Sequence, residues 1–235
     1  MPTDNFESPV ARRSFLTRFG AGMTVLSSGL AVGTGVSNAQ SGAASFRPAR
    51  HAQDDWMDKL PGKHRLVFDT TTPAGFGAAV AYANNFLIAS KDGYGLNDQD
   101  HAIIIIARHF ATPFAYNDAI WAKYVKAMPP FVVIDDPKTK QRPNFNLFKV
   151  SGYGLDLPNL GTTIDDVVKK GVNFAVCQFA TRFFSGPLAQ ATGGNADAVY
   201  NELVANLIPN SHLAAAGIVA VNRAQERGYT LSTAV

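Results

Sequence analysis

The chain has a single cysteine, Cys177, among its 235 residues. One cysteine excludes an intramolecular disulfide and any multi-cysteine zinc site within one subunit. Three uses of that thiol remain: a structural role, a reactive role, or a bond to another molecule. Charged residues are also scarce, at 17%, and the net charge is only +3. This bias is too weak to indicate nucleic-acid binding.

Several catalytic and binding motifs are missing as well. No Gly-x-Ser-x-Gly elbow occurs, so a Ser-His-Asp hydrolase is unsupported. The run from Pro73 to Gly77 lacks the third glycine of a dinucleotide fingerprint and the Gly-Lys-Ser/Thr of a P-loop, so we expect no cofactor there. The histidines outside position 109 show no metal-ligand spacing, which leaves only a metal site shared between subunits.

The N-terminus carries an export pattern. Arg12-Arg13-Ser14-Phe15-Leu16 matches the twin-arginine signal, and a glycine-diluted apolar stretch and the small residues Ser37-Asn38-Ala39 follow it. We therefore expect a signal peptide over residues 1–39 and a periplasmic or otherwise exported protein with no stable membrane span after cleavage. The alternative is an N-terminal membrane anchor, which the glycines disfavour. Residues 40–62 read as a linker or N-terminal arm, pinned by Trp56 and Met57.

From residue 63 to 235 apolar strands alternate with helical patterns. The clearest strand is Ala102–Ala107, because its four consecutive isoleucines suit a strand that is covered on both faces. Other expected elements are strands at His64–Thr70, Val172–Val176 and Tyr229–Ser232, and helices from Thr72 to about Lys91, from Thr112-Pro113 to about Ala127, from Thr163 to about Lys170, after Cys177, around Asp197–Leu207 and around Ala215–Arg227. This order predicts one three-layer α/β/α domain of Rossmann-like type, with a mainly parallel sheet of about five strands.

Residues 129–161 interrupt this alternation with five prolines. A segment of this length with little regular structure usually forms a functional loop, a lid or an oligomer contact, and we read it as an insertion with a short hairpin. Its aromatics Phe145, Phe148 and Tyr153 suit either a pocket or an interface, and we favour the interface.

Cys177 is the leading candidate for chemistry. It ends an apolar strand and a helix follows at once, and reactive groups gather beyond the carboxyl ends of parallel strands. Arg182 in that helix, and Arg108 and His109 after the isoleucine strand, are candidates to stabilise an anionic sulfur. The alternative is a buried cysteine that packs among neighbouring phenylalanines as a small hydrophobe. Asp69 ends the first strand, where it either caps the next helix or lies in the cleft, and we favour the cap.

Two stretches resemble the DsrE/DsrF-like family of small sulfur-relay proteins. One runs from Gly171-Val172 through Cys177 to Arg182 and Gly186. The other is the tail, with Ile208-Pro209, Ala216-Gly217-Ile218-Val219 and Arg223-Ala-Gln225-Glu-Arg-Gly228-Tyr229, and Asn84-Asn85 fits too. The resemblance implies a Rossmann-like fold, homo-oligomers (trimers or hexamers), and sulfur carried as a persulfide on the strand-end cysteine, which is Cys177 here. The export signal and the long insertion depart from the family pattern.

Two functional hypotheses follow. In the first, an exported DsrE-like protein binds or relays sulfur on Cys177, with Arg182 as electrostatic partner, Arg108 and His109 as further candidates, and a small sulfur species or a sulfur-donor protein as partner. In the second, the protein is a non-catalytic periplasmic binding or oligomeric assembly module. Its segment 129–161 then contacts a ligand or partner, and the cysteine is structural.

Overall fold

A computed structural model describes residues 47–235. The predicted signal peptide, residues 1–39, and the first part of the predicted arm lie outside the described residues. The helices and strands are, in chain order, α1 (Trp56–Lys59), β1 (His64–Thr70), α2 (Pro73–Tyr94), β2 (His101–Ala107), α3 (Asp118–Tyr124), α4 (Ile164–Lys169), β3 (Asn173–Cys177), α5 (Gln178–Thr192), α6 (Ala196–Ala205), β4 (Ser211–Ala214), α7 (Gly217–Gln225) and β5 (Thr230–Ala234).

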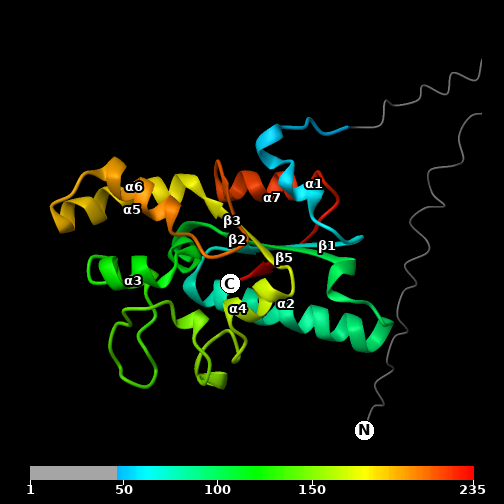
Figure 1. Ribbon diagram of the computed structural model, residues 1–235, viewed down its shortest axis with the longest axis horizontal. Coiled ribbons are helices and arrows are strands. Elements are labelled where there is room, and N and C mark those ends of the chain that lie inside the picture. Colours follow the sequence, from blue (N-terminus) through cyan, green and yellow to red (C-terminus); the bar gives the residue numbers. More distant parts are fainter. Residues whose placement is uncertain (1–46) are drawn as a thin grey trace, which may run out of the picture. The chain divides into compact units, whose positions relative to one another are not determined.

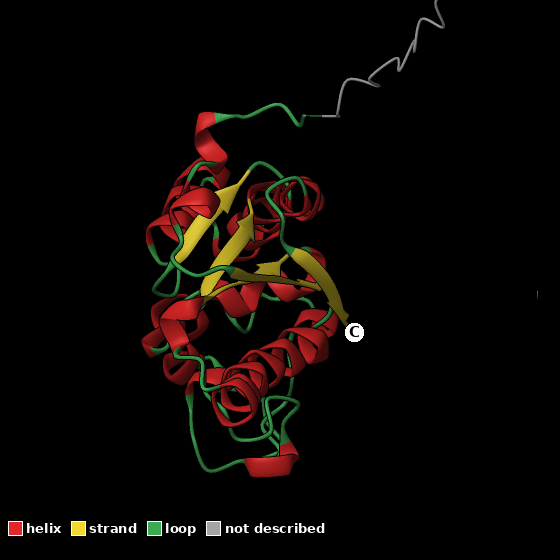
Figure 2. Ribbon diagram, turned by 90° about the vertical axis from the view of Figure 1, so that its right-hand side faces the viewer, coloured by secondary structure: helices red, strands yellow, loops and turns green. Residues whose placement is uncertain are grey.

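The strands form one five-stranded sheet in the order β4-β3-β2-β1-β5, and every pair of neighbours is parallel. Helices cover both faces of this sheet (Figures 1 and 2). The predicted fold class, a three-layer α/β/α Rossmann-like domain, is thus confirmed. The strand β4 is an addition to the four strands whose positions the sequence predicts.

The central strand β2 explains why the sheet needs cover on both sides. All of its residues are buried, and successive side chains point to opposite faces. Ile103 and Ile105 join the larger apolar cluster, whereas Ile104 and Ile106 join the smaller one. The buried side chains of α2 and α5 belong to the first cluster and those of α7 to the second. In Figure 1, α7 and α1 lie above the sheet and α2 and α4 below it.

Local sequence signals set several boundaries correctly. Thr72 caps α2 by accepting a hydrogen bond from the Gly75 N–H, and Pro73 occupies the first turn. Gly95 ends the helix in the left-handed conformation. Thr163 caps α4 in the same manner, through the Asp166 N–H.

The predicted helix start at Thr112-Pro113 is wrong. Residues His109–Ala115 form a 3-10 helix, η3, and the α-helix begins only at Asp118. The reason is Asn117, whose side chain accepts from the N–H groups of Ala119 and Ile120 and whose backbone is extended.

The segment 129–161, all of it described, contains no strand, so the predicted hairpin is wrong. It forms three short 3-10 helices, η4 (Pro130–Val132), η5 (Leu147–Lys149) and η6 (Gly154–Asp156). Its aromatics are core rather than interface: Phe148 is fully buried against Phe76 and Phe114, and Tyr153 is buried with its hydroxyl donating to Asp136. Phe145 is half-buried and packs on the same core.

The described part of the arm packs on the domain as predicted for Trp56 and Met57. Met57 is fully buried in the smaller cluster, and the Trp56 ring stacks on His212 with centroids 3.9 Å apart. Asp58 accepts from the Arg227 guanidinium at 3.1 Å. The arm therefore covers the face of the sheet that α7 also covers.

Candidate functional site

The topology opens a pocket beyond the carboxyl ends of β3 and β4. The connection that leaves β3 forms α5 on one face of the sheet, and the connection that leaves β4 forms α7 on the other. Adjacent strands whose connections part in this way leave a crevice between them, which is where open α/β sheets bind ligands. The pocket found there has a volume of about 490 Å³.

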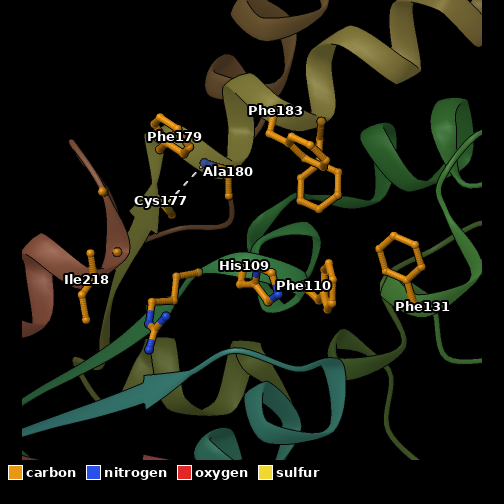
Figure 3. Close-up of a pocket in the computed structure, with 12 residues that line it drawn as sticks. His109, Phe110, Phe131, Cys177, Phe179, Ala180, Phe183 and Ile218 are labelled. Carbon is orange, nitrogen blue, oxygen red and sulfur yellow. Dashed lines mark hydrogen bonds between the residues drawn. The ribbon is translucent and has the colours of Figure 1, made fainter.

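Residues from four parts of the chain line this pocket. The segment after β2 contributes Arg108, His109 and Phe110, the segment after β4 contributes Ala216, Gly217 and Ile218, and η4 contributes Phe131. The end of β3 and the first turns of α5 complete the lining with Cys177, Phe179, Ala180, Phe183 and Phe184. Figure 3 shows the labelled side chains of α5 facing His109, Phe110 and Phe131 across the open space.

Cys177 occupies the N-cap position of α5 and lines the pocket. Its Sγ accepts a hydrogen bond from the Ala180 N–H at 3.3 Å, the dashed line in Figure 3. The residue is 6% exposed, so the thiol meets solvent only through the pocket. Because the N-terminus of a helix carries partial positive charge, this position favours negative charge on the sulfur.

A buried hydrogen-bonded chain fixes the backbone of Cys177. The Thr181 hydroxyl donates to the Cys177 carbonyl at 3.0 Å, and the Tyr116 hydroxyl donates to Thr181 at 3.0 Å. Tyr116 is fully buried, and this burial raises the pKa of its phenol well above the usual range. The phenol therefore stays protonated and serves as a permanent donor to Thr181.

Arg108 brings a guanidinium to the pocket, but that group is held by Asp69. Its Nε and Nη2 donate to the two carboxylate oxygens at 2.6 and 2.8 Å. The hydrogen bond to Asp69 raises the pKa of Arg108, and negative charge on Cys177 acts in the same direction. The predicted cap at Asp69 is wrong, since Thr72 caps α2 and Asp69 is used to hold Arg108 instead.

Gly217 allows Arg108 to take this position. A β-carbon at residue 217 would collide with the side-chain stem of Arg108. Sequence reasoning noted Gly217 only as part of a motif and did not place it at the site. If Ser211–Ala214 is recognised as a strand, Gly217 can be placed at the site from the sequence, because the residues after this strand fall at the same sheet edge as Cys177.

His109 also lines the pocket. Its backbone is in the left-handed region, with φ +55°, which is uncommon for a residue other than glycine. The ring stacks on Phe110 with centroids 3.8 Å apart, and the residue is exposed. The imidazole is therefore accessible both to solvent and to the pocket.

Arg182 is not brought to the pocket. Its guanidinium donates to Asp197 at 2.6 Å and lies 3.4 Å from the centre of the Tyr200 ring, so it faces α6. It is not among the described side chains that line the pocket. Instead of Arg182, it is Arg108, after the neighbouring strand β2, that lines the pocket together with Cys177.

The aromatic walls were missed as site residues. Phe179 and Phe183 are 76% and 61% exposed although they sit one turn apart on α5, and Phe131 is 55% exposed. Phe131 and Phe110 face each other with ring centroids 4.5 Å apart. Exposed apolar side chains gathered in one place indicate a binding surface. The spacing of Phe179 and Phe183 was visible in the sequence, but it read equally well as core.

Two further structural features bear on the kind of site. Within residues 47–235 no three His, Cys, Asp or Glu side chains come close enough to hold a metal ion. Nor does the described part of the chain include a helix with both the length and the apolarity to cross a bilayer.

The fold and the pocket define a Rossmann-like α/β/α protein with one cysteine in an aromatic-lined pocket at the sheet edge. No family model and no curated protein matches the chain. Among solved structures, it matches a protein of unknown function, MTH1491, from Methanobacterium thermoautotrophicum, with 13% identity over 73% of this chain and 99% of that one, at a TM-score of 0.35. That likeness carries no argument about the site.

Proposed function

We propose that this chain is a DsrE-like sulfur carrier in which Cys177 accepts a sulfur atom and holds it as a persulfide. The observation that carries the proposal is the position of the Sγ atom, which lines the pocket and accepts the Ala180 N–H at the start of α5. The resemblance of the Cys177 and tail motifs to the DsrE/DsrF-like family supports it. Export through the twin-arginine route and assembly as a homo-oligomer are parts of the same proposal.

The chemistry is a transfer of sulfane sulfur between thiols. The Cys177 thiolate attacks the outer sulfur of a donor persulfide, R–S–SH. A new S–S bond forms on Cys177, the S–S bond of the donor breaks, and its electron pair leaves with the donor thiolate, RS⁻. Mass and charge balance without an external oxidant or reductant.

The residues around Cys177 have separate tasks in this step. The Ala180 N–H and the helix N-terminus stabilise negative charge on the attacking sulfur. Arg108 lines the pocket with a guanidinium whose position Asp69 fixes and whose charge Asp69 balances. His109 lines the pocket and is positioned to give a proton to the departing thiolate.

The test is the intact mass of the purified full chain after incubation with glutathione persulfide. The wild type should gain one sulfur atom that a reductant removes, and Cys177→Ser should gain none. A wild type that takes up no sulfur, or a Cys177→Ser variant that takes up the same amount, contradicts the proposal.

A second candidate is a non-catalytic binding module, and the exposure of Phe131 favours it. This ring comes from the segment 129–161 and lines the pocket although it is 55% exposed. Deleting the segment is no test, because its Phe148 and Leu147 are buried in the core. Phe131→Ser tests it instead: ligand binding should weaken in this variant, whereas Cys177→Ser should leave ligand binding unchanged.

A further inference from the structure

We propose that the sulfur donor at this pocket is an uncharged, apolar sulfane, of which cyclo-octasulfur is the simplest example. This inference rests on the proposed function and names its substrate class. It excludes small anionic donors such as thiosulfate as the preferred substrate.

The first support is the chemical character of the walls. Five phenylalanines and Ile218 surround Cys177, and they come from α5, η4 and the segments after β2 and β4. Phe179, Phe183 and Ile218 are all more than half exposed, so a ligand that covers them removes apolar surface from water. A donor with an apolar body gains this free energy, whereas a small hydrated anion does not.

The second support is the state of the Arg108 guanidinium at the pocket. Asp69 neutralises Arg108 through two short hydrogen bonds, and the pair is mostly buried. Arg182 is turned to Asp197 on α6. Among the described side chains that line the pocket, Arg108 is the only Lys or Arg residue, and its charge is already balanced. A multiply charged anion entering the pocket would therefore lose its hydration with little in return, which is costly.

The third support is size and sulfur contact. A volume of about 490 Å³ lies within the range of roughly 300–1,000 Å³ that small-molecule pockets occupy. Divalent sulfur packs favourably against aromatic rings, and here rings stand on several sides of the cavity. A compact ring of sulfur atoms therefore finds both the room and the partners it needs.

The reaction with such a donor needs no co-reactant. The Cys177 thiolate attacks one sulfur of the ring and forms an S–S bond. One S–S bond of the ring breaks, and its electron pair stays on the far end of the opened chain as a terminal sulfur anion. All atoms remain on Cys177, and the negative charge moves from the thiolate to the chain end.

The experiment compares sulfur uptake from dispersed cyclo-octasulfur, glutathione persulfide and thiosulfate, measured by intact mass over time. The variants are Phe179→Ser and Phe183→Ser, whose rings are largely exposed, and Leu155→Ser, an 86% exposed control from η6 that does not line the pocket. Each phenylalanine variant should slow uptake from cyclo-octasulfur about tenfold, which corresponds to about 1.4 kcal/mol of lost contact. Uptake from glutathione persulfide should fall less than uptake from cyclo-octasulfur in the phenylalanine variants. In the Leu155→Ser control, uptake from each donor should stay within about twofold of the wild-type rate.

A second arm uses cyclooctane, an apolar ring without S–S bonds, to protect Cys177 of the wild type from iodoacetamide. Protection that the Phe183→Ser variant loses supports the apolar site. Uptake from glutathione persulfide or thiosulfate without uptake from cyclo-octasulfur, and with no protection, overturns the inference and leaves the sulfur-carrier function standing. Protection without sulfur uptake from any donor overturns the sulfur-carrier function and, with it, the sulfane substrate.

Discussion

Arg108 and Asp69 form a two-pronged ion pair across neighbouring strands, with Nε–Oδ1 and Nη2–Oδ2 distances of 2.6 and 2.8 Å. The register of β1 and β2 makes this possible, because Thr70 lies opposite Ala107 and the two charged residues flank that pair. Arg108 lines the pocket, and the pair holds its side-chain stem beside Gly217.

Asp69→Asn should destabilise the protein by about 2 kcal/mol, because it leaves a largely buried guanidinium without its charged partner. Urea unfolding followed by circular dichroism measures this free energy. Asp92→Asn, an exposed position on α2, is the matched control and should change it by less than about 0.5 kcal/mol. Equal effects in the two variants would mean that the ion pair contributes nothing to stability.

Gly217→Ala should destabilise the protein by about 1–3 kcal/mol, because the new methyl group meets the Arg108 side chain. Gly93→Ala on α2 is the control, since a β-carbon there meets no atom within 4 Å. It should instead stabilise the protein by about 0.5–1 kcal/mol, through the better helix propensity of alanine. Thermal unfolding of both variants decides the matter: if Gly217→Ala is neutral or stabilising, the close packing of Arg108 on α7 is refuted.

The Trp56–His212 stack should make stability depend on pH. Burial lowers the pKa of His212 from its usual value of 6.5, so the folded state binds this proton less readily than the unfolded state does. The stability that the folded protein gains by keeping His212 neutral is therefore fully present above pH 6.5. It is lost as the pH falls from there through the lower pKa that His212 has in the folded state.

His212→Phe removes this titration and retains a ring to stack on Trp56. The loss of unfolding free energy between pH 7.5 and pH 5 should be smaller in this variant than in the wild type, whereas the exposed His51→Phe should lose as much as the wild type. Chemical denaturation at the two pH values measures the difference. Identical losses in all three proteins would show that His212 is not the group responsible.

Local sequence signals predicted much of the fold because they act over a few residues. Thr72-Pro73 and Thr163 cap their helices with their own side chains, and the isoleucines of β2 admit no structure but a buried strand. The start of α3 escaped prediction, since Thr112-Pro113 carries the same kind of signal yet lies in a 3-10 helix packed under the sheet edge. There tertiary packing outweighs the local preference.

The sequence predicted those site residues whose position follows from strand order alone. It missed those whose position depends on how side chains pack against other elements. Cys177, Arg108 and His109 share a sheet edge because β2 and β3 are adjacent and parallel. Arg182 faces α6 because the opposite face of α5 packs on the core, and the position of α6 is not encoded within α5. Asp69 was assigned to a cap because its partner lies 39 residues away in sequence.

The central claim is that the Cys177 thiol is activated and reachable through the pocket. The most direct measurement is its rate of alkylation by iodoacetamide at neutral pH, in the native chain and in the same chain unfolded in urea. The account predicts that the native thiol reacts faster, because the Ala180 N–H and the start of α5 stabilise the thiolate that attacks. A native thiol that reacts more slowly than the unfolded one, or not at all, contradicts the account.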